Sequence, residues 1–285
     1  MLRQKRKIDI CVLSDIHLGT RGCNAKFLLN YLNSIQPSLL ILNGDIMDIW
    51  NFKKSYFPKD HLMIINTILK MMENGSKVVY ITGNHDDVLR KFSDINIGDL
   101  TITDKYLFKI DDKIHWAFHG DVFDHTTTGY AKVIAKLGGK GYDLLVVVNR
   151  LINSFLAMIG EERISFSKKI KNSVKSAAKW ISNFEQTATE IAIEEGYDYV
   201  ICGHIHQPKI ELIRTKKGVV TYMNSGDWIE NFTSLEYYDG EWNLFEYEAK
   251  KEEMMHNGIE YSYQALSSIE LSSFIPTNVN YVNIQ

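Results

Sequence analysis

The stretch IDICVLSDIHLG, residues 8–19, runs from an apolar segment directly into a polar segment that ends on glycine. The apolar half is rich in Ile, Val and Leu, which predicts a buried β-strand from Ile8 to Ser14. The polar half places Asp15 and His17 two residues apart, so in an extended or sharply turning backbone both side chains point the same way. A carboxylate and an imidazole that converge after a strand are candidate metal ligands.

The same alternation continues along the chain and predicts an α/β protein. Strands at Leu39–Asn43 and Lys77–Thr82 alternate with helices expected at Asn24–Asn33 and Asp60–Glu73. Further strands are expected at Ile114–His119, Tyr199–Gly203, Gly218–Asn224, Ser234–Tyr238 and Trp242–Tyr247, the last two joined by an Asp-Gly hairpin turn. Because the later strands are typical of antiparallel pairing, we expect a layered, mixed β-sheet flanked by helices.

Polar clusters follow four more of these strands: NGDIMDIW (43–50), TGNHDD (82–87), AFHGD (117–121) and CGHIH (202–206). Loops at the carboxyl ends of strands in an open α/β sheet share one crevice. Five of the nine histidines fall in these loops, which histidines scattered for structural reasons would not do. The candidate ligands are therefore Asp15, His17, Asp45, Asn84, His119, His204 and His206.

This set of ligands has a chemical meaning. Carboxylate, imidazole and amide oxygen suit Mn²⁺, Fe²⁺ or Zn²⁺, and the absence of any CxxC pair among the three cysteines excludes a closed thiolate zinc site. Seven candidates exceed the needs of one ion, so we expect two, of which Mn²⁺ is the preferred identity. Taken singly, each residue could be a helix cap, a turn residue or a buried core histidine. Together, the clusters favour a metal site.

Residues 124–196 show long helical periodicity without a strand candidate, which predicts an inserted helical cap. The core would then consist of residues 1–123 and 197–250, and residues 251–285 would form a C-terminal tail of unknown role. Residues 130–180 carry ten Lys and Arg against three Asp and Glu, a balance of +7, whereas the whole chain carries −3. The cap also holds an apolar run from Leu144 to Ile159. A basic cap with an apolar run suits an anionic substrate that bears acyl chains. Alternatively, the apolar run could pack on the sheet or on a partner chain, and the lysines could form a solvated face.

Bulk properties narrow the function classes. A net charge of −3 disfavours a general nucleic-acid binder, and few, unpaired cysteines fit a reducing cytosol. The first residues lack the features of a signal peptide, and Asn149, Arg150 and Asn153 interrupt the apolar run before it could span a membrane. We therefore expect a cytoplasmic protein that contacts the inner face of the cytoplasmic membrane peripherally.

The order of the clusters resembles the signature of the calcineurin-like metallophosphoesterase superfamily: Asp15-x-His17, Gly44-Asp45-x-x-Asp48, Gly83-Asn84-His85-Asp86, His119-Gly120 and Gly203-His204-x-His206. The resemblance implies a four-layer fold and two ion sites that share Asp45 as a bridge. One ion would be held by Asp15, His17, Asp45 and His206, and the other by Asp45, Asn84, His119 and His204. His85 would face the substrate phosphate.

Within that superfamily, GDIMDIW (44–50), the helical insertion and NSGDWIENFTSLEY (224–237) are most similar to the UDP-2,3-diacylglucosamine hydrolases of lipid A synthesis. One departure is His85, where the best-known branch of these hydrolases has arginine. The resemblance implies cleavage of the pyrophosphate bond of UDP-2,3-diacylglucosamine, or of a similar lipid-linked nucleotide, to UMP and a lipid phosphate. We expect catalytic roles for Asp45 and His85 and substrate contacts by Asn84, His85, Arg150 and Lys168.

Two other functions stay open at this point. A metallophosphoesterase of soluble nucleotides or phosphoproteins would need the same ligands without the lipid-binding cap. A metal-bound scaffold that binds partners without catalysis would leave His85 without a purpose. The oligomeric state is open as well.

Overall fold

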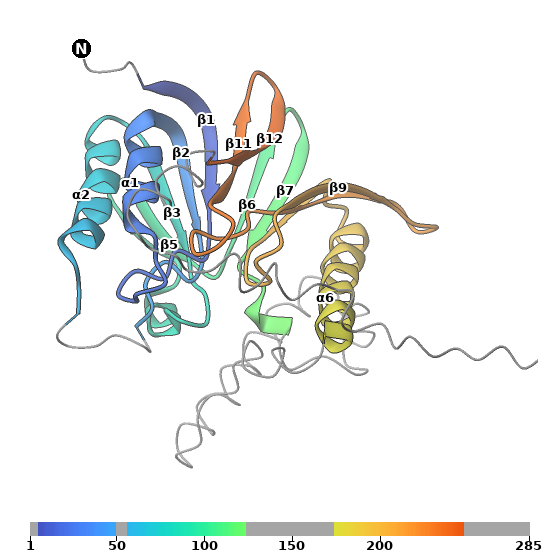
Figure 1. Cartoon of the computed structure of the whole chain (residues 1–285). Helices are drawn as coiled ribbons and strands as arrows, with labels where there is room; N and C mark the ends of the chain where they lie inside the picture. The colour runs from blue at the N-terminus through green and yellow to red at the C-terminus, as the bar shows by residue number, and fades with distance from the viewer. Residues whose placement is uncertain (1–4, 50–55, 124–173, 248–285) are drawn as a thin grey trace, which may run out of the picture. The chain divides into compact units, whose positions relative to one another are not determined.

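The structure is a computed structural model that describes residues 5–49, 56–123 and 174–247 (Figure 1). Its first half contains β1 (Arg6–Leu13), α1 (Ala25–Ser34), β2 (Ile35–Asn43), α2 (Lys59–Glu73), β3 (Lys77–Ile81), the 3₁₀ helix η1 (Asp87–Phe92), β4 (Ile95–Ile97), β5 (Leu100–Thr103), β6 (Lys105–Ile110), β7 (Lys113–Phe118) and the 3₁₀ helix η2 (Asp121–Phe123). Its second half contains α6 (Val174–Glu194), β8 (Tyr199–Cys202), β9 (Lys209–Arg214), β10 (Val219–Asn224), β11 (Thr233–Tyr238) and β12 (Glu241–Glu246).

The strands form two mixed sheets. A seven-stranded sheet has the order β12-β11-β1-β2-β3-β5-β4, in which β1, β2, β3 and β5 run parallel. A five-stranded sheet has the order β6-β7-β8-β10-β9, in which β7, β8 and β10 run parallel. The antiparallel strands therefore lie at the edges, and the parallel strands lie in the centre of each sheet, where apolar runs are buried on both faces.

The two sheets pack face to face across a shared core. The residues of this core from the first sheet are Ile10, Val12, Ile41, Val79, Ile81 and Leu235, and those from the second are Ala117, Ile201 and Met223. Helices α1 and α2 cover the outer face of the first sheet, and α6 covers the outer face of the second (Figure 1). The predicted layered, mixed α/β architecture is confirmed, and the order of layers is helices, sheet, sheet, helix.

Helix α6 packs through one apolar stripe. Trp180, Phe184, Ala188, Ile191 and Ala192 recur at helical spacing and are all buried against the second sheet. This contact places the final turns of the predicted insertion on the core. Residues 124–173 lie outside the described residues, so the extent of a separate cap stays a prediction. Within the described part of the chain, no helix is both long and apolar enough to cross a membrane.

Candidate metal centre

The candidate ligands follow the carboxyl ends of five central strands, three in the first sheet and two in the second. Backbone hydrogen bonds tie these loops together: the amide of Asp15 donates to the carbonyl of Gly44 at 3.1 Å, and the amide of His17 donates to the carbonyl of Asp45 at 2.9 Å. The amide of His204 donates to Asp15 Oδ2 at 3.0 Å, which joins the two sheets at the site. The topology thus brings together segments that lie 189 residues apart in the sequence.

Two glycines allow the loops to approach this closely. A Cβ atom on Gly83 would lie 2.2 Å from Asp45 Oδ1, and one on Gly44 would lie 2.3 Å from the ring of His119. Gly44 also has a φ of +82°, a conformation that other residues rarely adopt. Both positions therefore require glycine because the space beside them is already filled by candidate ligands.

Backbone strain gathers at the same place. Asp15, His17, Asp45, His204 and His206 all have φ between 52° and 66°, in the left-handed region. A residue other than glycine in this region costs about 1 kcal/mol or more and persists only where the surroundings enforce it. Such strain is typical of functional sites, where the required direction of a side chain outweighs the conformational energy of its backbone.

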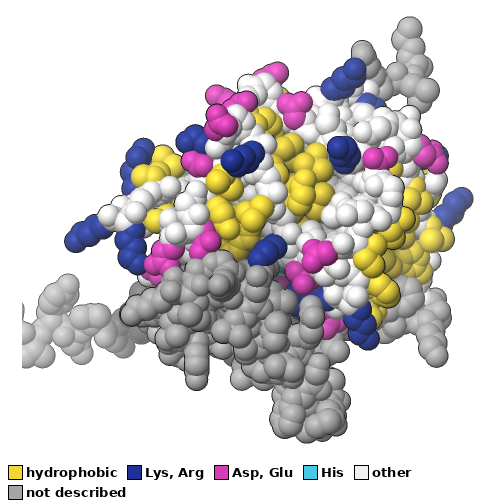
Figure 2. All heavy atoms as spheres, turned by 180° about the vertical axis from the view of Figure 1, so that it is seen from behind, with side chains coloured by type: hydrophobic (Ala, Val, Ile, Leu, Met, Phe, Trp, Pro, Cys, Tyr) yellow, Lys and Arg dark blue, Asp and Glu magenta, His cyan; other side chains and the backbone are white. Residues whose placement is uncertain are grey.

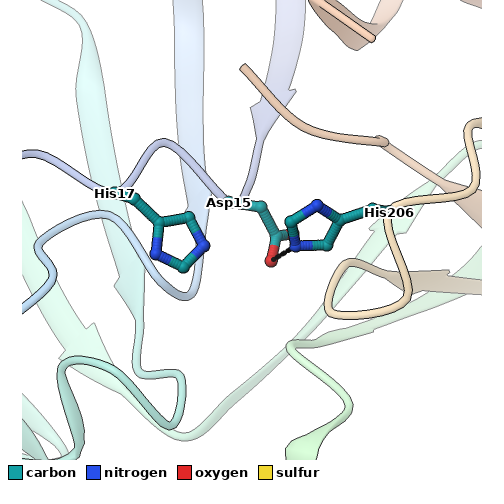
Figure 3. Close-up of side chains that lie close together, drawn as sticks. All are labelled: Asp15, His17 and His206. Carbon is teal, nitrogen blue, oxygen red and sulfur yellow. Dashed lines mark ion pairs between the residues drawn. The ribbon is translucent and has the colours of Figure 1, made fainter. Parts of the chain in front are cut away.

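The side chains converge into three overlapping groups whose ligand atoms lie within 4.8 Å of one another. These groups are Asp15, His17 and His206; His17, Asp48 and His85; and Asp45, His119 and His204. Figure 3 shows the first group, with Asp15 between the two imidazoles. No histidine side chain of the described residues is visible on the face of the molecule that Figure 2 draws.

Asp45 occupies the centre of the cluster. Its Oδ2 atom lies 3.3 Å from His119 Nε2 and 4.0 Å from His17 Nε2. Burial alone would raise the pKa of Asp45, but the neighbouring imidazoles, His119 foremost, hold it well below its usual value. Asp45 is therefore an ionised carboxylate that lies between the imidazoles of His17 and His119, and its role as a bridging ligand stays a prediction.

The outer nitrogens of two candidate ligands are held by protein groups. His119 Nδ1 lies 2.9 Å from the carbonyl oxygen of Asn43, and His17 Nδ1 lies 3.4 Å from Asp48 Oδ2. A carbonyl or carboxylate at Nδ1 fixes the proton there and leaves a lone pair on Nε2, the arrangement found around histidines that bind metals. Both Nε2 atoms face the cluster.

Asp48 also contacts His85, because its Oδ1 atom lies 3.0 Å from His85 Nδ1. Burial lowers the pKa of His85, but the contact with Asp48 and the charge of Asp45 together raise it above its ordinary value. The sequence contained Asp48 in the GDxxD block but gave no reason to assign it a role. That role depends on the meeting of two loops, which spacing alone does not reveal.

The site fits divalent cations. Among the described residues, four buried ligand atoms have no hydrogen-bond partner: Asp15 Oδ1, His17 Nε2, Asn84 Oδ1 and His119 Nε2. Buried polar atoms are nearly always satisfied, so a cluster of bare acceptors indicates a missing positive group. Asp15 Oδ1 and His206 Nε2 are 3.1 Å apart, close to the ~3.0 Å expected for two ligands that bind one ion at about 2.1 Å and at right angles.

The described residues thus bring together six of the seven predicted ligands and His85, and the seventh, Asn84, precedes His85 on the same loop. Arg150 and Lys168 lie outside the described residues. The ring centroids of Trp180 and Phe184, from α6, lie 5.8 Å and 6.3 Å from that of His204. Two aromatic side chains of α6 therefore lie beside the predicted ligand His204. Whether each residue binds an ion stays a prediction.

The chain is similar to several known proteins. The chain is 25% identical to a UDP-2,3-diacylglucosamine hydrolase of Aliivibrio fischeri, over 85% of this chain and 100% of the relative. It is 24% identical to a UDP-2,3-diacylglucosamine hydrolase of Blochmanniella pennsylvanica, over 78% of this chain and 88% of the relative. Among solved structures, an archaeal phosphodiesterase has 16% sequence identity and a TM-score of 0.42, covering 83% of this chain and 98% of that chain.

A family model also matches more than half of the chain. The model for calcineurin-like phosphoesterases matches residues 8–208, a range that contains every candidate ligand described above. The chain therefore belongs to the calcineurin-like phosphoesterase family and is a metal-dependent phosphoesterase.

Proposed function

We propose that this phosphoesterase hydrolyses the pyrophosphate bond of UDP-2,3-diacylglucosamine, or of a similar lipid-linked nucleotide, to UMP and a lipid phosphate. The observation that carries the proposal is the position of Asp45, whose carboxylate lies between His17 and His119 among bare, buried ligand atoms. The curated relatives named as UDP-2,3-diacylglucosamine hydrolases supply the substrate class.

Two ions, held as the sequence predicts with Asp45 shared between them, fit the carboxylate, imidazole and amide donors, for which Mn²⁺ is the preferred identity and Fe²⁺ or Zn²⁺ the alternatives. Bound divalent ions supply positive charge to phosphoryl oxygens and acidify a water molecule. Asn84 and His85 lie next to each other on the loop after β3, where they would orient the phosphate. His85, held by Asp48, would donate a proton to the leaving oxygen or stabilise its charge.

The lipid part of the proposal rests on the predicted cap. Phe123, directly before residues 124–173, and Phe184, on α6 after them, lie beside the site, because their rings are 5.5 Å apart and Phe184 adjoins His204. A segment that leaves and rejoins the core there can line the path of an acyl chain away from the ions. Arg150 and Lys168 would contact the anionic part of the substrate, and the basic cap would approach the inner face of the cytoplasmic membrane.

The direct test compares three substrates in the presence of Mn²⁺: UDP-2,3-diacylglucosamine, a UDP-sugar without acyl chains, and bis(p-nitrophenyl) phosphate. We expect the acylated substrate to have the lowest KM, and Leu151→Asp or Phe155→Asp to raise that KM while leaving hydrolysis of the small diester intact. Equal efficiency with and without acyl chains would favour the soluble-nucleotide alternative. Failure to hydrolyse any phosphoester with both ions bound would favour the scaffold.

Asp45→Ala provides the matching test of the ion site. We expect loss of both ions in metal analysis and loss of activity, because both predicted sites share this carboxylate. Asp239→Ala is the control, since Asp239 is an exposed aspartate in the β11–β12 turn with a φ of 53° against 54° for Asp45. Full activity and metal content in Asp45→Ala would remove Asp45 as the bridge.

A further inference from the structure

His206 has a contact on the side that faces away from the cluster. Figure 3 shows one ring nitrogen of His206 turned to Asp15 and the other turned away. His206 Nε2 lies 3.1 Å from Asp15 Oδ1, and on the far side Nδ1 lies 3.5 Å from Asp227 Oδ2. Asp227 is fully buried, whereas the side chain of His206 is about one third exposed (35%).

The carboxylate of Asp227 is fixed by hydrogen bonds from protein groups. Its Oδ1 atom accepts hydrogen bonds from the amides of Ile229 at 2.8 Å, Glu230 at 2.6 Å and Asn231 at 3.2 Å. The side chain of Asn231 donates to Oδ2, and it also donates to the backbone carbonyl of His206 at 3.0 Å. One short turn therefore holds both the ring and the backbone of His206.

This support is placed where the backbone needs it. His206 has a φ of 54°, so its left-handed conformation has to be enforced by its surroundings. The amide of Trp228 also donates to the carbonyl of Asp15 at 3.2 Å, which ties the same turn to the other ligand of the pair. The turn thus contacts both Asp15 and His206 without contributing a ligand.

We propose that Asp227 is a positioning residue for the metal centre: it holds the proton of His206 on Nδ1, aims the Nε2 lone pair at the ion shared with Asp15, and acts together with Asn231. The inference rests on the proposed function, because it assumes that His206 binds an ion. It completes a pattern that His17 and His119 already show, in which an acceptor at Nδ1 leaves Nε2 bare. Partners of this kind change metal affinity about 10- to 100-fold.

Asp227 caps its turn through Oδ1 and contacts His206 through Oδ2, so a substitution that changes only the second atom can separate these two roles. In Asp227→Asn the side-chain oxygen can still accept from the three backbone amides, since asparagine caps turns as well as aspartate does. The amide nitrogen would then face His206 Nδ1 and Asn231, and a donor there opposes the proton on Nδ1. The control is Glu236→Gln, which removes charge from another buried carboxylate that contacts Arg6 and Tyr31 instead of a ligand.

The experiment measures Mn²⁺ binding by titration calorimetry and the tautomer of His206 by ¹⁵N NMR of the Zn²⁺-loaded protein. We expect Asp227→Asn to weaken one of the two ions about 10- to 100-fold, to leave the other ion unchanged and to disturb the His206 signal. Asn231→Ala should weaken the same ion to a smaller extent, and Glu236→Gln should change neither ion.

Two results would overturn the inference alone, with the proposed function left standing. One is a wild-type affinity and tautomer in Asp227→Asn, and the other is equal weakening of both ions with a lower melting temperature, which would mean a purely structural role. A wild-type protein that binds no divalent ion would overturn the proposed function and the inference with it.

Discussion

A single methyl group at Gly83 tests whether the position of Asp45 decides activity. In Gly83→Ala the new Cβ would lie 2.2 Å from Asp45 Oδ1 and 2.5 Å from the backbone nitrogen of Asp45. Ordinary contacts begin at 3.4 Å, so the carboxylate has to move by about 1.2 Å. The substitution adds no charge and removes none, so its effect has to come from displacement of Asp45.

The expected loss follows from that distance. Asp45 Oδ2 lies 3.3 Å from His119 Nε2, and a displacement of this size takes it out of range of one predicted ion site. Misplacement of a catalytic group by about 1 Å costs about 100-fold in rate. We therefore expect kcat/KM to fall about 100-fold, metal content to fall below two ions per chain, and overpacking to cost about 1–3 kcal/mol of stability.

The assay is hydrolysis of bis(p-nitrophenyl) phosphate, with metal content and melting temperature measured on the same samples. Gly22→Ala is the control, because a Cβ there would meet Ile229 at 3.7 Å and Thr20 at 3.8 Å, which are ordinary contacts. Folded Gly83→Ala protein that keeps two ions and an activity within about threefold of wild type would refute the reasoning, since a 100-fold loss is expected.

Two further predictions concern histidines. His85→Ala should reduce hydrolysis of diesters with alkoxide leaving groups far more than hydrolysis of pyrophosphate-linked substrates, because a leaving phosphate needs little protonation. Equal losses of kcat/KM on both kinds of substrate would indicate a purely electrostatic role for His85. Burial lowers the pKa of His115 to about 4, so as the pH falls the imidazole gains its proton in the unfolded chain before it does so in the folded protein. The free energy of unfolding should therefore fall by about 1–2 kcal/mol between pH 6.5 and pH 4 after solvent screening. Urea titrations should show a shallower pH dependence in His115→Gln, and an unchanged dependence would contradict this account.

The strands that carry the site were predictable because they are the most apolar. Strands β1, β2, β3 and β8 carry buried Ile, Val and Leu, and β7 ends on buried Trp116, Ala117 and Phe118. All five overlap the predicted strands, although β2 begins at Ile35, four residues before the predicted start at Leu39. Strands β4, β5, β6 and β9 were not predicted. Edge positions explain most of them: Lys105–Ile110 exposes alternate residues near its end, Lys209–Arg214 exposes four of its six residues, and their charged side chains weaken the apolar signal.

The same division holds at the candidate site. Residues directly after strands were found by their order, because strand ends meet at one edge of a sheet. Asp48 and Asp227 were not assigned a role, since each acts across a loop whose path no spacing rule describes. The face of α6 was also beyond prediction: its periodicity indicated a helix, but only packing shows that Trp180 and Phe184 reach His204.

The origin of the ligands in two different sheets has a thermodynamic consequence. Asp45 follows a strand of the first sheet and His119 follows a strand of the second, so any ion that both hold acts as a non-covalent crosslink between the layers. An ion present at 100 times its Kd stabilises the folded state by about 2.7 kcal/mol, and linkage requires the reverse effect to be equally large. A substitution at Ala117 or Met223, deep between the sheets, would then weaken the apparent metal affinity as soon as it leaves part of the protein unfolded, and removal of the metal would lower the melting temperature.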